Sequence, residues 1–422
     1  MLDIKFIRQN VSLVKKVLEA RNYSFDLESF LKLDEERRLL IKEVDNSRSQ
    51  QNELNRKIKS LIKEKKDISL FLEETKKIAQ KIDELEERLK MTKDRFQKEL
   101  LRIPNIFHSS VPQGDASFNK IVKEVKKIRN FSFKPLAHME LGKHLELFSF
   151  PVASKLCGSN FVLFKKDGAL LSRALINFML DIHRKRGYQE IFPPFLVNRA
   201  SMLTTGQLPN LEEDMYQLKD DDYFLVPTAE VPVTNIYRDE ILEEDDLPLY
   251  FVSYTACFRR EAGSYGKETK GLVRVHQFDK VELVKFVHPS TSYEELEKLV
   301  EDASYILELL ELPYRVVLLS TQELSFAASK CYDLEVYAPG IERWLEVSSC
   351  SNFEDFQARR GNIHYREKKS GKLKYIHTLN GSGLALPRLI IALLENYQNS
   401  DGSVTIPQVL RKYMHGKEKL EK

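Results

Sequence analysis

Apolar residues recur every three or four positions through most of the N-terminal quarter of the chain. From Leu27 to Ile103 there is no proline and no glycine, and charged residues are dense. Two heptad-like series, separated near Lys65–Ser69, predict two helices folded into an antiparallel coiled-coil hairpin. Each arm would be about 50 Å long at ~1.5 Å per residue. The hairpin is expected to end at Ile103-Pro104-Asn105, because proline interrupts a helix.

The predicted seam of this hairpin is apolar at most positions, and Ser47 and Gln51 weaken it. A coiled coil of this kind commonly serves as a dimerisation or spacer arm. Between Arg56 and Lys66, close to the expected tip, six residues are basic and one is acidic. A basic tip on a rigid arm suits a phosphate backbone, while a solvated lysine-rich face is the alternative. The seam positions are Leu33, Arg37, Leu40, Val44, Ser47, Gln51, Leu54, Ile58 and Leu61, then Ile68, Leu72, Thr75, Ala79, Ile82, Leu89, Phe96 and Leu100.

After a linker at residues 111–114 the pattern changes to short strand-like runs with few helices. The runs lack the strict βαβ alternation of a parallel sheet, which favours an α+β fold: an antiparallel β-sheet domain flanked by helices. We expect two domains, residues 1–105 and residues 106–422. The predicted strands are Tyr188–Ile191, Tyr223–Val226, Leu249–Phe258, Leu272–Phe286, Tyr314–Leu319, Tyr332–Tyr337 and Trp344–Ser348, and the predicted helices are Leu175–Gly187, Tyr293–Leu312 and Leu386–Gln398.

Composition narrows the class of protein. The chain has 422 residues, enough for two or three domains, and a net charge of only +3, so any nucleic-acid surface must be local. The four cysteines are widely spaced, which argues against a zinc site or a disulfide framework and fits the cytoplasm. The sequence contains no apolar run near the ~20 residues that span a bilayer, so we expect no membrane partner.

The stretch TACFRREAGSYGKETKGLVRVHQF, which begins at Thr255, combines charge with strand-like patterning. Alternate strand residues share a face, so Arg259 would face the same side as Glu261. Arg274, Phe278 and Glu282 would share another face, with Val273, Val275 and Val281 turned toward a core. Single charged residues on a strand are usually solvated. Here they accompany a glycine-containing loop, residues 263–271, in which Lys267 and Lys270 can reach phosphates.

This set of side chains suits a nucleotide together with a small zwitterion. Arginine forks match phosphate or carboxylate oxygens, an aromatic ring stacks on a base, and a carboxylate holds an ammonium or a hydroxyl. The usual phosphate loops are absent, because GSYGKET lacks the Walker spacing and NGSGLAL lacks a third glycine and a preceding βαβ strand. A Walker ATPase and a Rossmann dehydrogenase are therefore disfavoured.

Three ordered segments resemble the signature motifs of the class II aminoacyl-tRNA synthetases, and closely those of the bacterial-type seryl-tRNA synthetases. They are ALINFMLDIHRKRGYQEIFPPFLV, TACFRREAGSYGKETKGLVRVHQF and NGSGLALPRLIIALLENYQ. The stretches TGQLP, PTAEVPVTN, KVELVKF and SSCSNFEDFQARR add serine-specific similarity. The likeness covers nearly the whole chain, including the N-terminal hairpin.

The resemblance implies a homodimer built through the first motif, with ATP and Mg²⁺ in the site. It implies that L-serine is activated to seryl-adenylate and passed to tRNA-Ser, whose long variable arm the hairpin would hold. The selenocysteine tRNA is an open second substrate. Neither chemical step needs a protein nucleophile, so catalysis would come from positioning and charge stabilisation.

The resemblance also implies roles for individual residues. Arg259 would bridge the serine carboxylate and the α-phosphate, Glu261 would read the adenine amino group, and Phe278 would stack on adenine. The catalytic residues would be Arg259, Arg274 and Arg388. The serine site would comprise Thr228, Ala229, Glu230, Arg259, Glu282 and Ser382. The ATP site would comprise Arg259, Arg260, Glu261, Arg274, Val275, Phe278, Glu346, Val347, Ser348, Ser349 and Arg388, with Glu346 and Ser349 as the metal ligands.

Two departures from the family pattern stand in these motifs. Pro387 occupies a position where the family commonly has glycine, but proline is tolerated in the first turn of a helix. Lys267 and Lys270 stand where arginines are common, which keeps the charge and loses the bidentate geometry.

Three alternative functions remain at this point: a ligase that loads a carrier protein, a non-catalytic RNA-binding paralogue, and a coiled-coil interaction protein. The basic hairpin counts against the first, the intact motifs against the second, and the large α+β region against the third.

Overall fold

The computed structural model describes residues 1–262 and 271–422 of the chain. Contacts divide it into two compact units: residues 2–19 with 23–103, and residues 1, 20–22 and 104–422. In the first unit, two long helices follow two short ones. These are α1 (Ile4–Gln9), α2 (Val11–Ala20), α3 (Leu27–Lys63) and α4 (Ser69–Leu100).

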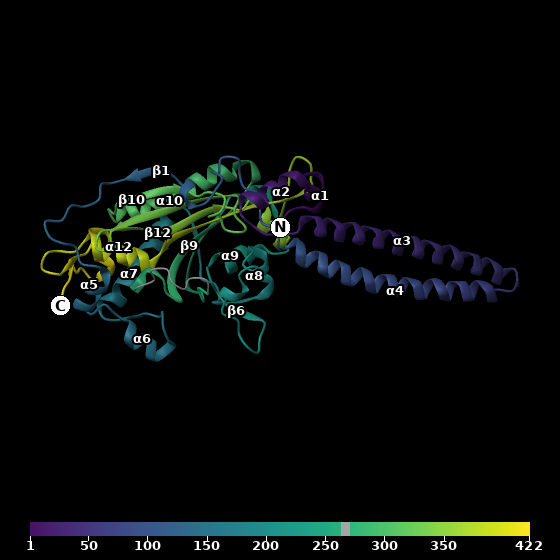
Figure 1. The fold of residues 1–422 in the computed structure, drawn as a ribbon, viewed down its shortest axis with the longest axis horizontal. Coiled ribbons are helices and arrows are strands. Elements are labelled where there is room, and N and C mark those ends of the chain that lie inside the picture. Colours follow the sequence, from purple (N-terminus) through teal and green to yellow (C-terminus); the bar gives the residue numbers. More distant parts are fainter. Residues whose placement is uncertain (263–270) are drawn as a thin grey trace. The chain divides into compact units, whose positions relative to one another are not determined.

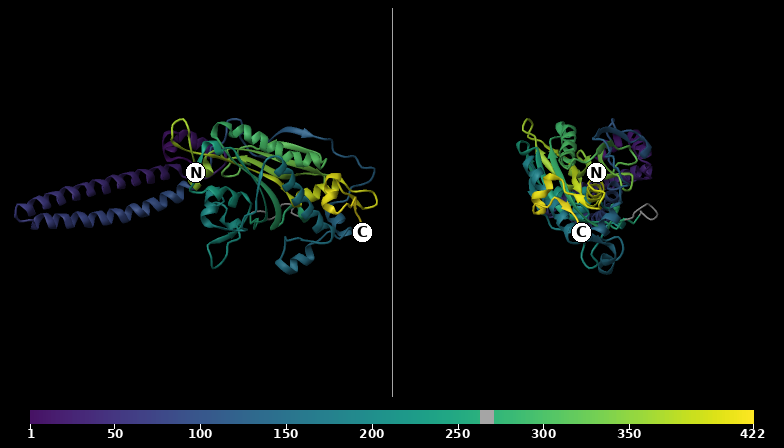
Figure 2. Two further views of the ribbon diagram at one scale, coloured as in Figure 1. Left: turned by 180° about the vertical axis from the view of Figure 1, so that it is seen from behind. Right: turned by 90° about the vertical axis from the view of Figure 1, so that its left-hand side faces the viewer.

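Helices α3 and α4 form the predicted antiparallel hairpin, and Figures 1 and 2 show them side by side. Phe30 stacks on Phe96 with ring centroids 5.3 Å apart, and Arg48 pairs with Glu86 at 2.7 Å. Asp26 begins α3, because its carboxylate accepts a hydrogen bond from the backbone N–H of Ser29.

The second long helix departs from the predicted seam at one position. Leu72 is 51% exposed, while the neighbouring Phe71 is half-buried and lies 5.8 Å from the ammonium of Lys57. The buried or half-buried residues Phe71, Thr75, Ile78 and Ile82 continue the three- and four-residue steps of the contact face, and Leu72 lies one position outside that series. The basic residues from Arg56 to Lys66 lie at the tip, where α3 ends, and are exposed.

The second unit is built on an eight-stranded sheet, which confirms the predicted α+β fold. Every neighbouring pair in it is antiparallel except β4 with β8. In spatial order the strands are β1 (Lys120–Val125), β10 (Tyr314–Leu318), β11 (Lys330–Ala338), β12 (Arg343–Asn352), β15 (His377–Ala385), β9 (Gln277–Val287), β8 (Leu249–Phe258) and β4 (Gln189–Ile191).

Three helices bury their apolar sides against this sheet and form the main core (Figure 1): α7 (Asp167–Lys185), α10 (Ser292–Leu309) and α12 (Leu386–Asn396). In α10 the buried residues Leu296, Leu299, Ala303 and Ile306 recur with the three- and four-residue steps of one helix face. No helix among the described residues is long and apolar enough to cross a membrane.

Shorter elements complete the second unit. The short helices are α5 (His138–His144), α6 (Phe150–Cys157), α8 (Arg199–Thr205), α9 (Glu230–Thr234), α11 (Phe356–Gly361) and α13 (Gln408–Arg411). The short strands are β2 (Phe148–Ser149), β3 (Leu163–Phe164), β5 (Leu196–Asn198), β6 (Tyr223–Leu225), β7 (Ile241–Glu243), β13 (His364–Arg366), β14 (Leu373–Tyr375), β16 (Val404–Thr405) and β17 (Lys419–Leu420).

The strand predicted from Leu272 begins later than expected. Gly271–Val273 form a 3-10 turn, η5, and β9 starts only at Gln277. Gly271 has a φ of +72°, a left-handed conformation that is incompatible with a strand at this residue. Arg274 therefore precedes the strand and does not share a strand face with Phe278 and Glu282, as the alternation had predicted. Val281 is buried in the main core and Val273 packs against it, as predicted. Val275 is buried as well, and Val273 and Val275 also line a pocket.

Candidate active site

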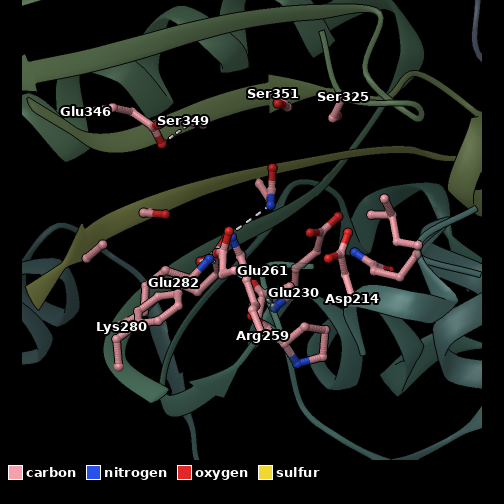
Figure 3. A pocket seen from close by; sticks show the side chains of 18 of the residues that line it. Asp214, Glu230, Arg259, Glu261, Lys280, Glu282, Ser325, Glu346, Ser349 and Ser351 are labelled. Carbon is pink, nitrogen blue, oxygen red and sulfur yellow. Dashed lines mark hydrogen bonds and ion pairs between the residues drawn. The ribbon is translucent and has the colours of Figure 1, made fainter. Parts of the chain in front are cut away.

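Three adjacent strands, β12, β15 and β9, form the floor of a cavity of about 460 Å³, and Arg259 reaches it from just beyond the end of β8. Their register places chemically active residues side by side, because Glu282 pairs with Ser382 on β15 and with Ser253 on β8. Most predicted site residues line this cavity: Thr228, Glu230, Arg259, Glu261, Arg274, Val275, Phe278, Glu282, Glu346, Val347, Ser349, Ser382 and Arg388. Figure 3 shows Glu346 and Ser349 on one side of it, with Arg259, Glu261 and Glu282 opposite.

Three predicted site residues do not line the cavity. Ala229 is fully buried just before α9, and Arg260 is exposed. Ser348 is buried behind the strand surface, where its hydroxyl donates a hydrogen bond of 2.7 Å to the backbone oxygen of Ser382. Ala229 and Ser348 therefore lie behind the pocket wall. Lys267 and Lys270 lie outside the described residues.

Arg259 and Phe278 stand together at the open end of the β8–β9 hairpin. The guanidinium carbon of Arg259 lies 5.3 Å from the centroid of the Phe278 ring, within cation–π range. Its Nε donates to the backbone oxygen of Pro227 at 3.2 Å, which fixes the side chain at the cavity wall. A fixed arginine beside an aromatic ring suits an anionic group attached to a base.

Glu261 and Arg274 form an ion pair across the two backbone segments that follow β8 and precede β9. The carboxylate of Glu261 lies 3.2 Å from Nε of Arg274, and both side chains line the cavity. The sequence analysis placed the two residues on separate strand faces. The structure instead joins them at the pocket wall.

Arg388 enters the cavity from the first turn of α12, with Pro387 beside it. Its Nε donates to the backbone oxygen of Val273 at 3.1 Å, and its Nη1 donates to the backbone oxygen of Glu346 at 2.9 Å. The same nitrogen lies 3.2 Å from the Glu346 carboxylate. Proline at this position is compatible with the helix start, because a first-turn N–H has no helical partner to lose.

Oxygen ligands gather on β12 and β11 opposite the arginines. The hydroxyl of Ser349 lies 3.1 Å from a carboxylate oxygen of Glu346 and 2.6 Å from one of Asp333. Burial and the nearby charge of Glu346 hold the pKa of Asp333 well above its ordinary value. Burial acts against ionisation of Glu346 as well, but the charge of Arg388 and the hydrogen bond from Ser349 lower the pKa of that carboxyl.

These oxygens fit a magnesium ion. Mg²⁺ is typically held by one or two carboxylates together with water and substrate phosphates. Glu346 and Ser349 supply hard oxygen donors at the wall of the cavity, and Asp333 lies behind them. Among the described residues no cluster of three or more His, Cys, Asp and Glu side chains forms an all-protein metal cage. A site completed by phosphate is the arrangement that these residues favour.

The inner end of the cavity is a buried polar pocket. Glu282 is 1% exposed, lies 2.5 Å from the ammonium of Lys280 and accepts a hydrogen bond of 3.0 Å from Asn380. Lys280 also donates to the hydroxyl of Thr228 at 3.0 Å. Together these contacts fix the Glu282 carboxylate while leaving it at the cavity wall.

Glu230 is the second buried carboxyl of this pocket. Burial, followed by the neighbouring charge of Glu282, raises its pKa to about 7. Gln357 donates to it at 2.6 Å and is itself held by Thr205 and Thr378. A carboxyl poised near neutrality among buried polar groups marks a functional site, and an ammonium ligand would favour its charged form.

Sequence reasoning missed several residues of the site: Lys280, Asp333, Gln357 and Asn380. Period-2 alternation places Lys280 on the same strand face as Phe278 and Glu282, so this residue could have been found. Gln357, Asp333 and Asn380 carry no comparable signal. Their contacts depend on the pairing of β11 with β12 and of β15 with β9, or on helix α11, which carries Gln357 and comes from a distant part of the chain.

An antiparallel sheet whose arginine-bearing hairpin, acidic strand and helix-borne arginine close one cavity defines a class II aminoacyl-tRNA synthetase core. The family model described as "tRNA synthetase class II core domain (G, H, P, S and T)" matches residues 214–397. The family model described as "Seryl-tRNA synthetase N-terminal domain" matches residues 1–107.

Relatives extend the match to the full chain. A serine–tRNA ligase of Thermodesulfovibrio yellowstonii is 51% identical over 98% of this chain and 99% of its own length. The structure of seryl-tRNA synthetase from Pyrococcus horikoshii complexed with ATP is 37% identical and gives a TM-score of 0.92, covering 100% of this chain and 99% of that one. A cytoplasmic serine–tRNA ligase from Naegleria fowleri in complex with AMP is 26% identical, with a TM-score of 0.87 over 100% of this chain and 99% of that one. The chain belongs to the seryl-tRNA synthetase family.

Proposed function

We propose that the chain activates L-serine with ATP and transfers the seryl group to tRNA-Ser, releasing AMP and pyrophosphate. The observation that carries this proposal is one cavity with two different ends. Arg259, Phe278 and Arg388 line its nucleotide-like end, and the buried carboxyls of Glu230 and Glu282 line its inner end. A nucleotide and a small amino acid can therefore meet within it.

In the first step a carboxylate oxygen of serine attacks the α-phosphorus of ATP, and pyrophosphate leaves. Arg259 neutralises the charge that builds up on the α-phosphoryl oxygens. Phe278 stacks on the adenine ring, with Arg388 on the base's other side, and Arg274 reaches the terminal phosphates. Because no side chain serves as nucleophile, the rate arises from orientation and from charge stabilisation.

Serine is selected by the buried end of the cavity. The ionised form of Glu230 binds the substrate ammonium, and Glu282 accepts a hydrogen bond from the substrate hydroxyl. Ser382, Thr228 and the backbone at Ala229 close the pocket around a small side chain. A pocket built to bond a hydroxyl rejects the analogue lacking it by about 10⁴-fold.

Mg²⁺ would be held by Glu346 and Ser349 together with the phosphates of ATP. When bound, the ion supplies positive charge that shields the phosphates and favours departure of pyrophosphate. Arg388 bonds Glu346 and keeps its carboxylate ionised, so this arginine prepares the ligand side chain as well as contacting the nucleotide.

In the second step a hydroxyl of the terminal tRNA adenosine attacks the seryl carbonyl, and AMP leaves. Residues 1–105 act as the tRNA-binding domain, with the basic tip from Arg56 to Lys66 on the long variable arm, and residues 106–422 act as the catalytic domain. Recognition through shape and backbone suits RNA. The protein acts as a homodimer in the cytoplasm, where its four free cysteines remain reduced.

Serine-dependent exchange of pyrophosphate into ATP tests the first step without tRNA. We expect exchange with serine in the unaltered protein and a loss of about 10²- to 10³-fold in Arg259→Gln. Replacement of an arginine outside the cavity, Arg411→Gln, is the matched control and should leave the rate unchanged. Absence of serine-dependent exchange in the folded, unaltered protein would exclude the proposed reaction.

A further inference from the structure

Glu261, a residue of the ATP-binding end, has a strained backbone. Its φ is +53°, in the left-handed region that residues other than glycine rarely adopt. A residue holds such a conformation only where its surroundings stabilise it. The backbone N–H groups on either side of Glu261 are both hydrogen-bonded to another part of the chain.

One residue provides both partners. The backbone N–H of Arg260 donates to the backbone oxygen of Asp214 at 2.8 Å, and the backbone N–H of Ala262 donates to the Asp214 carboxylate at 2.8 Å. Asp214 ends a short 3-10 turn, Glu212–Asp214, and comes from a distant part of the chain. Asp214 therefore holds the backbone on both sides of Glu261.

Asp214 also lines the cavity, where Figure 3 shows it beside Glu230 and Arg259. A carboxylate at the edge of a phosphate-binding cavity would repel the nucleotide if it faced the ligand alone. Here the carboxylate accepts a hydrogen bond from the backbone of the neighbouring wall. Its place in the cavity is explained by this structural contact, without any contact to substrate.

The η5 turn, which ends at the residue before Arg274, is held in a comparable way. The backbone N–H of Leu272 donates to Nε2 of His138 at 3.4 Å, and Nδ1 of His138 lies 3.0 Å from a carboxylate oxygen of Glu395. A Cβ atom added to Gly271 would lie 2.5 Å from Nε2 of His138, so the ring packs directly against the η5 turn.

Glu395 is itself fixed. It is fully buried in α12 and accepts further hydrogen bonds from the backbone N–H groups of His138, Gly340 and Ile341 at 2.8, 2.8 and 3.2 Å. The partners assign the proton of His138 to Nδ1 and leave Nε2 as the acceptor for Leu272. Helix α12 carries both Glu395 and Arg388. The guanidinium group of Arg388 donates a hydrogen bond to the backbone oxygen of Val273, the residue after Leu272.

We infer that Asp214 and the His138–Glu395 pair are positioning residues that hold the two wall segments carrying Glu261 and Arg274. This inference rests on the proposed function of the cavity. The two anchors set the direction of the Glu261 carboxylate, and with it the recognition of the adenine amino group. They act through Glu261 and Arg274 and do not touch the reacting atoms.

Steady-state pyrophosphate exchange with ATP and with purine riboside triphosphate, which lacks the amino group, measures this role. In Asp214→Ala we expect the KM for ATP to rise about tenfold, with the KM for serine unchanged. The preference for ATP over the purine analogue should fall by a similar factor. Asp214→Asn keeps a side-chain oxygen acceptor and should restore both values to within about twofold.

A second variant and a control separate positioning from folding. His138→Phe keeps a ring and removes the acceptor for Leu272, and it should raise the KM for ATP in the same direction. Asp401→Ala removes a comparable carboxylate-to-backbone bond, to the N–H of Ser403 at 2.9 Å, away from the cavity, and should change neither KM. Thermal unfolding of each variant reports its folded fraction.

Different results would contradict the proposed function and the inference about Asp214 and His138. If the unaltered protein shows no serine-dependent exchange, the proposed function fails. If the unaltered protein is active and folded Asp214→Ala keeps its KM for ATP and its preference for the amino group, the inference is wrong. A rise in the KM for serine equal to that for ATP would also overturn it, because the effect would then be general. If Asp214→Ala does not fold, the KM for ATP and the preference for the amino group are measured in Asp214→Asn and His138→Phe instead. Unchanged values in folded His138→Phe would then overturn the inference.

Discussion

The ammonium of Lys280 lies 2.5 Å from the carboxylate of Glu282, and both side chains are almost completely buried. Lys280 also lies near the second buried carboxyl, Glu230, whose pKa its charge lowers in opposition to burial. One lysine thus compensates two acidic groups in the proposed serine pocket. The charge state of this pocket governs both stability and substrate binding.

Lys280→Met leaves these carboxyls without their cation. Loss of one partner of a buried ion pair costs about 3–5 kcal/mol, so we expect a decrease of that order in the free energy of unfolding, measured with urea. Lys417→Met provides a control, because Lys417 pairs with Asp167 at the surface, where about 0–1 kcal/mol is expected. Equal effects of the two substitutions would contradict the proposed compensation.

Glu282→Ala tests selection by hydroxyl recognition. The variant loses the acceptor for the serine hydroxyl, so kcat/KM for serine in pyrophosphate exchange should fall about 10³-fold or more. The value for alanine, which has no hydroxyl, should change far less. If both amino acids lose activity equally, Glu282 does not read the hydroxyl.

The raised pKa of Glu230 makes the stability of the folded protein depend on pH. Its pKa is about 7 in the folded protein against an ordinary 4.5, so the folded state keeps a proton that the unfolded chain releases. The contribution of this carboxyl to the free energy of unfolding is fully present below pH 4.5, where the group is neutral in both states. It declines by about 3 kcal/mol as the pH rises to 7.

Serine binding should follow the opposite trend, because the ammonium needs the ionised carboxylate. The KM for serine should fall as pH rises through about 7, with close to a tenfold change per pH unit below it. In Glu230→Gln the KM should be high and nearly independent of pH over this range. A pH-independent KM in the unaltered protein would rule out a titrating Glu230 in the empty pocket.

Pro387 is compatible with the placement of Arg388. Pro387→Gly should leave pyrophosphate exchange within about threefold, because Arg388 is fixed by the backbone oxygens of Val273 and Glu346. Stability should fall by about 0.4–1 kcal/mol, since glycine increases the entropy of the unfolded chain. A large gain in exchange rate would mean that proline misplaces the arginine. Arg388→Ala, which removes the contact itself, should be nearly inactive.

The N-terminal hairpin should be needed for tRNA charging alone. Deletion of residues 27–101 is expected to abolish charging and to spare serine-dependent pyrophosphate exchange. Replacing the tip residues Lys59, Lys63, Lys65 and Lys66 with Gln should weaken tRNA binding and reduce its salt dependence, because fewer phosphates are neutralised. Charging that survives the deletion would contradict the proposed role of the hairpin.

The long periodic elements were predictable from sequence. Leu249–Phe258 was placed without error because it is a nearly continuous run of apolar, aromatic and β-branched residues, bounded by Pro248 and by Arg259. The coiled-coil helices follow from the absence of proline and glycine. Leu72 was misplaced because the adjacent Phe71 is apolar as well, and hydrophobicity alone does not decide which of the two continues the three- and four-residue steps. Leu272 was misplaced because a glycine's backbone conformation is not encoded in hydrophobic alternation.

The residues of the candidate site also divide into those that the sequence predicted and those that it did not. Arg259, Phe278, Glu282 and Arg388 carry motif signals and reach one cavity, although the roles assigned to them stay predictions. Lys280 was overlooked because lysine is usually exposed, and only a buried carboxylate partner keeps it inside. Asp214 was overlooked because its function depends on backbone contacts made by a distant loop, which no local pattern specifies.

Charging of unfractionated bacterial tRNA with each of the twenty amino acids and ATP is the most direct measurement of the central proposal. The proposal predicts that serine alone becomes attached, and that the product is lost in Arg259→Gln. Attachment of another amino acid, or of none by the folded protein with intact tRNA, would contradict it.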